Sequence, residues 1–93
     1  MIPVIQTIEF DFNNEYVSYF KRLDLPFQPT KEIDYHLDVA LEDYYNPKNL
    51  WWEPGLGRLV IDFGINHLVI SPEELDKVFL AGGWTKGSYD PKE

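Results

Sequence analysis

The residues most suited to chemistry lie at alternate positions of residues 31–43, KEIDYHLDVALED. The even positions carry an anionic row, Glu32, Asp34, Asp38 and Glu42, with His36 between them. Side chains at i and i+2 of a strand project from the same face, roughly 6.6–7 Å apart. The odd positions from 33 to 41 carry aliphatic or aromatic residues, so the alternation predicts a strand with one buried face and one anionic face. Like charges on one face repel, and a positively charged partner would relieve that repulsion.

A second alternating run covers residues 2–12, IPVIQTIEFDF, and predicts a half-buried strand. Its outward face carries Glu9 and Asp11. If the two strands are neighbours, these carboxylates extend the anionic row into a grid. Such a grid could occupy the basic groove of a nucleic-acid-binding protein, because complementary charge favours encounter. The alternative is an ordinary solvated strand face.

Aromatic residues gather in residues 44–57, which also contain two Pro, two Gly and two Asn and therefore predict a long connection. The aromatic members are Tyr44, Tyr45, Trp51 and Trp52. Trp and Tyr dominate binding hot spots, so we expect Trp51 or Trp52, with a tyrosine, to anchor a partner. Two alternatives are that the rings cover the edge of the core, or that they stack on a nucleotide or another small ligand.

The sequence gives little support to catalysis or metal binding, and we expect no cofactor. Asp34, His36 and Asp38 span about 13 Å along a strand, too far for three ligands of one ion. A metal site would have to recruit Glu9, Asp11 or His67 from other strands. The chain has no Cys and no glycine-rich phosphate loop. A small hydrolase or metal protein stays as an alternative.

Composition limits the class of protein. The 93 residues give room for one domain, residues 1–93, and a net charge of −8 disfavours direct binding to nucleic acid or to an anionic membrane. The absence of cysteine favours a reducing compartment, and the first residues do not read as a signal peptide. We therefore expect a cytoplasmic protein without a membrane span.

The remaining segments predict the elements that would position these residues. Residues 13–24 have an Asn cap and an apolar stripe at helical spacing, which predicts a helix. Residues 58–63 predict a buried strand, residues 64–66 a turn and residues 67–70 a return strand. Ser71, Pro72 and Glu74 form a capping box for a helix over residues 71–81, with Trp84 folding back and residues 85–93 forming a flexible tail.

These elements, in the order β-α-β-β-β-α, predict a two-layer α+β domain with a mostly antiparallel sheet and both helices on one face. The functional prediction is a small acidic protein that inhibits a basic protein partner, as a nucleic-acid mimic or an immunity or anti-defence protein. A small-ligand-binding protein built on residues 44–57, or a subunit of a larger assembly, are the alternatives. The expected partner-binding residues are Glu9, Asp11, Glu32, Asp34, Asp38, Glu42, Tyr45, Trp51 and Trp52.

Overall fold

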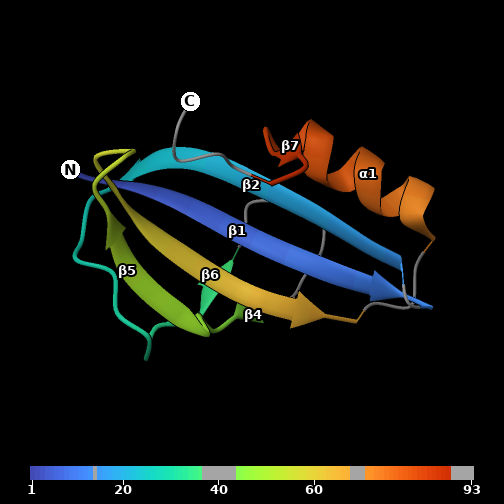
Figure 1. The fold of residues 1–93 in the computed structure, drawn as a ribbon, viewed down its shortest axis with the longest axis horizontal. Coiled ribbons are helices and arrows are strands. Elements are labelled where there is room, and N and C mark those ends of the chain that lie inside the picture. Colours follow the sequence, from blue (N-terminus) through green and yellow to red (C-terminus); the bar gives the residue numbers. More distant parts are fainter. Residues whose placement is uncertain (14, 37–43, 68–70, 89–93) are drawn as a thin grey trace.

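The fold is mixed α+β, with a five-stranded sheet, a second two-stranded sheet and one helix among the residues described (Figure 1). The structure is a computed structural model and describes residues 1–13, 15–36, 44–67 and 71–88. The strands are β1 (Ile2–Phe12), β2 (Glu15–Leu25), β3 (Tyr35–His36), β4 (Tyr44–Tyr45), β5 (Asn49–Glu53), β6 (Arg58–Asn66) and β7 (Thr85–Lys86), and the helix is α1 (Pro72–Ala81). Within the described residues, no helix has both the length and the apolar character that a bilayer crossing requires.

The predicted helix over residues 13–24 is wrong, because this segment is β2 and forms a hairpin with β1. The antiparallel register runs from Ile2 opposite Leu25 to Phe12 opposite Glu15. Asn13 has a φ of 51°, a left-handed conformation that asparagine tolerates well, so it serves a turn rather than a helix cap. The apolar residues of this segment fit a strand period as well as a helical one, and pairing with β1 decides between the two.

The order of the main sheet is β5-β6-β1-β2-β7. The β1–β2, β2–β7 and β5–β6 pairs are antiparallel and β1–β6 is parallel, so the sheet is mostly antiparallel as predicted. Residues 44–57 are not one long connection, since they contain β4 and β5. The predicted turn at residues 64–66 is also wrong, because β6 continues to Asn66 through an irregularity in its register with β1. Of the predicted return strand, residues 68–70 lie outside the described part of the chain.

The strand predicted over residues 31–43 is present only in part. Tyr35–His36 form β3, which pairs with β4 and not with β1, and residues 37–43 lie outside the described part of the chain. Glu32 and Asp34 precede β3 and are exposed. The condition for the grid, that this segment lies beside β1, is therefore not met by the described residues, because β1 has β2 and β6 on its two sides.

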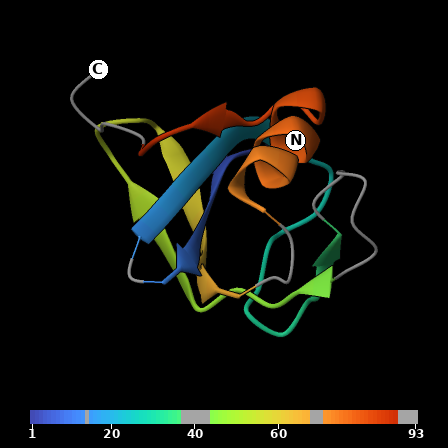
Figure 2. The same ribbon diagram turned by 90° about the vertical axis from the view of Figure 1, so that its right-hand side faces the viewer.

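One face of the sheet is covered by α1 and by the β3–β4 pair, which lie on the same side of it (Figure 2). Stacked and edge-on rings fill the contact with α1: the centroids of Phe10 and Phe79 lie 5.5 Å apart, and those of Tyr19 and Phe79 lie 4.5 Å apart. On the β3–β4 side, the centroids of Tyr35 and Phe63 are 5.6 Å apart. We predicted two helices on this face, and the structure has one helix and the β3–β4 pair there.

The start and end of α1 agree with the sequence. The backbone N–H of Glu74 donates to the Ser71 hydroxyl at 3.2 Å, and Pro72 occupies the first turn. After the helix, Trp84 returns to the core, where it is 3% exposed. Thr85 and Lys86, in the segment predicted as a flexible tail, form β7 along the edge of β2.

Two polar contacts of Asp76 connect α1 to β2 and to the edge strand β7. The Tyr19 hydroxyl of β2 donates to the Asp76 carboxylate of α1, and Lys86 Nζ of β7 lies 2.9 Å from Asp76 Oδ2. Tyr19 is fully buried, whereas the Asp76 side chain is 30% exposed. Burial is the largest cause that raises the Tyr19 pKa, and the hydrogen bond from Tyr19 is the largest cause that lowers the Asp76 pKa.

We expect Tyr19→Phe to lower the free energy of unfolding by about 1–2 kcal/mol, because it removes a hydrogen bond to a carboxylate that is partly exposed. Urea denaturation measures this loss. Tyr16→Phe is the matched control, since Tyr16 is 56% exposed, and it should leave the midpoint almost unchanged. Equal midpoints for Tyr19→Phe and Tyr16→Phe would contradict the assignment.

The lowered pKa of Asp76 also predicts a pH dependence. A carboxyl group whose pKa is lower in the folded chain contributes stability above its unfolded pKa of about 3.9, and this contribution is lost as pH falls through the folded value. The variant Asp76→Asn has no carboxyl group at residue 76 that could titrate. The difference in unfolding free energy between the unsubstituted protein and Asp76→Asn should therefore shrink as the pH is lowered from about 6 to about 2. A difference that is constant across that range would show that the Asp76 pKa is not lowered on folding.

Candidate functional site

The sheet has a second face, opposite α1, which we call the open face; it consists of the odd-numbered residues of β1 and their partners on β2, β5 and β6. Alternate residues of a strand point to opposite faces, and the even residues of β1 belong to the core that α1 covers. One row across the open face joins Asn49, Asp62, Thr7 and Phe20. The next row joins Ile65, Glu9 and Ser18. Two carboxylates therefore lie on neighbouring strands in adjacent rows.

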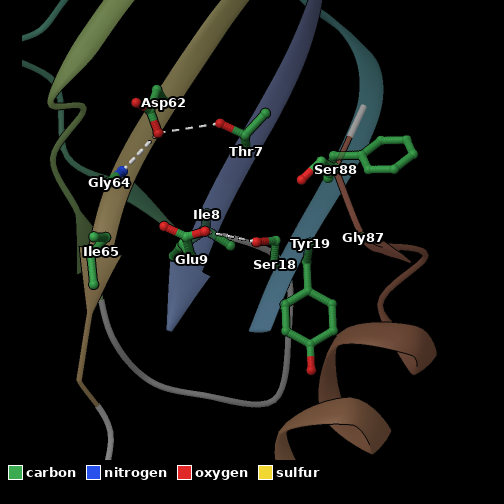
Figure 3. Close-up of a pocket in the computed structure, with 11 residues that line it drawn as sticks. Thr7, Ile8, Glu9, Ser18, Tyr19, Asp62, Gly64, Ile65, Gly87 and Ser88 are labelled. Carbon is green, nitrogen blue, oxygen red and sulfur yellow. Dashed lines mark hydrogen bonds between the residues drawn. The ribbon is translucent and has the colours of Figure 1, made fainter. Parts of the chain in front are cut away.

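A pocket of about 480 Å³ opens on this face (Figure 3). Its lining comes from β1, β2 and β6, with Gly87 and Ser88 beyond β7 forming a further wall. The Gly87 N–H donates to the Ser18 carbonyl at 2.7 Å, which holds that wall against β2. Figure 3 shows the Glu9 and Ser18 side chains directed toward each other from adjacent strands, while Tyr19 points toward α1.

Hydrogen bonds from neighbouring groups fix both carboxylates. Ser18 Oγ donates to Glu9 Oε1 at 3.0 Å. Thr7 Oγ1 and the Gly64 N–H donate to Asp62 Oδ1 at 3.3 and 2.9 Å, and Asn49 Nδ2 donates to Asp62 Oδ2 at 3.3 Å. These contacts order the two acidic side chains without neutralising their charge.

The ion pairs found within the described residues lie away from the pocket carboxylates. Arg58 and Asp24 approach to 3.7 Å at one end of the sheet, and Lys86 pairs with Asp76 on the side of α1. Arg22 lies 5.3 Å from the centre of the Phe20 ring. Within the described part of the chain, neither Glu9 nor Asp62 forms an ion pair with a lysine or arginine.

The predicted site residues fall into separate places. Glu9 lines the pocket, while Asp11, one step further along β1 and opposite Tyr16, does not. Glu32 and Asp34 are exposed near β3, and Asp38 and Glu42 lie outside the described residues. The structure brings none of the described acids of residues 31–43 beside β1.

The aromatic residues also separate. Tyr45 is 9% exposed and packs 6.4 Å from Phe63, so its ring belongs to the core and not to a surface anchor. Trp51 and Trp52 are 37% and 54% exposed. Trp51 is opposite Val60 on the open face, and Trp52 points to the other face of the edge strand β5. Among Tyr45, Trp51 and Trp52, only Trp51 shares a face with Glu9.

Sequence reasoning missed the importance of Asp62, Thr7 and Ser18. Asp62 is the only charged residue inside the apolar run LVIDF, and that isolation was the available signal. Ser18 could not be placed, because its segment was predicted as a helix. Thr7 has the same strand parity as Glu9, but nothing in the sequence connects it to residue 62.

The chemistry of the pocket is that of hydrogen-bond acceptors beside an apolar wall. Within the described residues, no group of three or more His, Cys, Asp or Glu side chains is arranged to hold a metal ion. The Ser18 and Thr7 hydroxyls both donate to carboxylates. Such a site suits a cationic donor better than an anion, because the carboxylates repel negative charge.

Comparison of the chain with protein-family models, curated proteins and solved structures gave no match.

The geometry of Gly64 predicts a measurable difference between two glycine substitutions. Gly57 and Gly64 have φ values of 64° and 72°, so alanine is strained at both, by about 1 kcal/mol or somewhat more. At Gly64 an added Cβ would lie 2.8 Å from Lys48 Cγ, whereas at Gly57 nothing lies within 4 Å. Gly64→Ala should therefore destabilise the protein by about 1 kcal/mol more than Gly57→Ala in urea denaturation. Equal losses would mean that Lys48 moves aside without cost.

Proposed function

We propose that this protein binds a basic surface of a partner protein through its open face and inhibits that partner. The observation that carries the proposal is the pocket with Glu9 and Asp62, two ordered carboxylates without an ion pair from the described residues. Ordered charges lose little side-chain freedom on binding, so more of the electrostatic attraction is retained. The net charge of −8 adds a long-range attraction for a basic partner.

Trp51 supports the same face as the contact surface. It lies on β5 opposite Val60, in the row next to Asn49 and Asp62, and 37% of it is exposed. Tryptophan is among the residues most enriched in binding hot spots. The open face thus combines a charged pocket with an apolar contact.

The class of partner follows from this charge. A basic groove that binds nucleic acid is one surface with dense positive charge, and an acidic protein can occupy it in place of phosphates. We therefore retain a nucleic-acid-mimic, immunity or anti-defence type of inhibitor as the proposed role. We centre the proposed contact on β1 and β6, because hydrogen bonds order Glu9 and Asp62 there.

A second candidate function is binding of a small ligand, which the pocket itself favours. Its volume of about 480 Å³ lies in the range of small-molecule sites. Its lining does not include residues 44–57, so the ligand would not use the aromatic segment that the sequence indicates. Thermal shift with cationic metabolites, in the absence of any protein partner, distinguishes this candidate from the first.

The proposed function predicts a charge-dependent association. The double variant Glu9→Gln/Asp62→Asn should slow association with the partner roughly tenfold, with a smaller effect on dissociation. The affinity of the unsubstituted protein should fall steeply as salt rises from about 0.05 M to about 0.5 M. Partners captured on the immobilised protein and eluted with a salt gradient supply the binding pair, and surface plasmon resonance measures the rates.

The matched control is Glu15→Gln/Glu73→Gln, which removes the same charge from exposed positions outside the pocket. It should retain most of the association rate. An affinity that does not change with salt, or equal rates for the two double variants, would contradict the proposed function.

A further inference from the structure

The hydrogen-bonding side chains on the strands of the pocket act as acceptors, while Ser88, beyond β7, adds a hydroxyl that can also donate. Ser18 and Thr7 each have one hydroxyl hydrogen, and each donates it to a carboxylate. Their oxygens can therefore offer only lone pairs to an occupant. Glu9 Oε2 receives no hydrogen bond from the described residues, and Asp62 Oδ2 receives one, from Asn49. The strands of the pocket therefore offer acceptors on four different side chains.

From this inventory we infer that the pocket binds the primary ammonium group of a lysine side chain of the partner, between Glu9 and Asp62. The inference rests on the proposed function and names the group that the open face recognises. Charge complementarity selects a cation, and the acceptors on the strands favour a cation that only donates.

The arrangement of the acceptors distinguishes lysine from arginine. An ammonium group has three donors directed apart, and these suit single oxygens on separate groups such as Glu9, Asp62 and Thr7. A guanidinium binds most strongly when two of its N–H groups meet both oxygens of one carboxylate. Both carboxylates already use an oxygen for a neighbouring donor, Glu9 for Ser18 and Asp62 for Thr7 and Gly64. The two-pronged arrangement is therefore the less favoured one here.

The pocket also has a surface for the methylene groups of a lysine. Ile65 and Phe20 both line it, and Ile65 is 52% exposed although it is an aliphatic side chain on the sheet. Long cationic side chains bury their methylene groups on apolar surface and leave the charged end to polar groups. Ile65 is opposite Glu9 in the register, so apolar surface and carboxylate adjoin.

The test is a ¹⁵N–¹H NMR titration of the full chain at low salt with Nα-acetyl-lysine N-methylamide. We expect saturable shifts of the amide signals of Thr7, Ser18 and Gly64, with a dissociation constant in the millimolar range, as a single side chain allows. Nα-acetyl-arginine N-methylamide should bind at least threefold more weakly. The Nε-acetylated lysine derivative has no charge and should produce no saturable shift. Equal binding of the charged and the acetylated lysine compounds, or no binding of either, would overturn the inference.

Variants assign the site. Glu9→Gln should weaken binding of the lysine compound at least fivefold, and the control Glu73→Gln on α1 should leave it unchanged. Gln at residue 9 can still accept the hydrogen bond from Ser18, so the variant is expected to fold, and the retained pattern of the other amide signals checks this. An unchanged affinity in a folded Glu9→Gln variant would remove Glu9 from the site. Asp62→Asn gives a second, independent measurement.

A free diamine has the same ammonium chemistry, and 1,5-diaminopentane distinguishes it from a partner's lysine. Binding of the diamine more than tenfold tighter than the lysine compound would overturn the assignment to a partner and favour a small-amine site.

The proposed function and the lysine inference can fail separately. A salt-sensitive partner that binds unsubstituted protein while the lysine compound does not bind contradicts only this inference. Binding of the lysine compound to Glu9, with no salt-sensitive partner, contradicts only the proposed function.

Discussion

Both edges of β1 are hydrogen-bonded, and this constraint decides which side chains the molecule buries and which it presents. All eleven residues of β1 have a partner on β2, and β6 lies along its other edge. A strand held on both sides cannot shift by one residue without exchanging its two faces. The even residues, such as Val4, Ile8 and Phe10, then form the floor of the core, and Thr7 and Glu9 must face away from it. The open face and its carboxylates are a consequence of that register.

A single helix covers only part of the core face of this sheet, and polar contacts with β2 hold it there. The last turn of α1 has no basic residue to balance its carbonyl groups. Lys21 of β2 points toward the helix and its Nζ donates to the Gly82 carbonyl at 2.9 Å, so a strand residue supplies the cation that the helix end lacks. Together with Tyr19 and Asp76, this contact attaches α1 to β2 by polar groups at the margin of an aromatic core. The side of the sheet toward β5 and β6 is covered by Tyr35 and Tyr45 instead.

An element could be predicted from the sequence where the residues that determine it lie close together in the chain. The alternation of β1 and the cap of α1 at Ser71 involve residues close in the chain, and both were predictable. Residues 15–25 were ambiguous, because Lys21 interrupts the alternation of apolar residues, and only its distant contact with Gly82 explains a lysine on that face. The parallel pairing of β1 with β6 joins residues more than fifty positions apart, and no local pattern encodes it. Half of the candidate site was therefore beyond reach: Glu9 could be predicted as outward-facing, but its proximity to Asp62 could not.

The open face is more than a solvated side of a sheet, and its apolar part bears on how strongly its charges act. Ile5 and Val60 are register partners that point away from α1, yet neither has exposed surface. They form an apolar row that ends in Trp51, directly beside the row that contains Asp62. Charges next to apolar material interact more strongly than charges surrounded by water, because the local dielectric is lower. A partner that covers Trp51 would also exclude water from Asp62 and Glu9, so apolar contact and charge recognition would reinforce each other. Under the proposed function, that coupling would make binding at the open face more specific than net charge alone would.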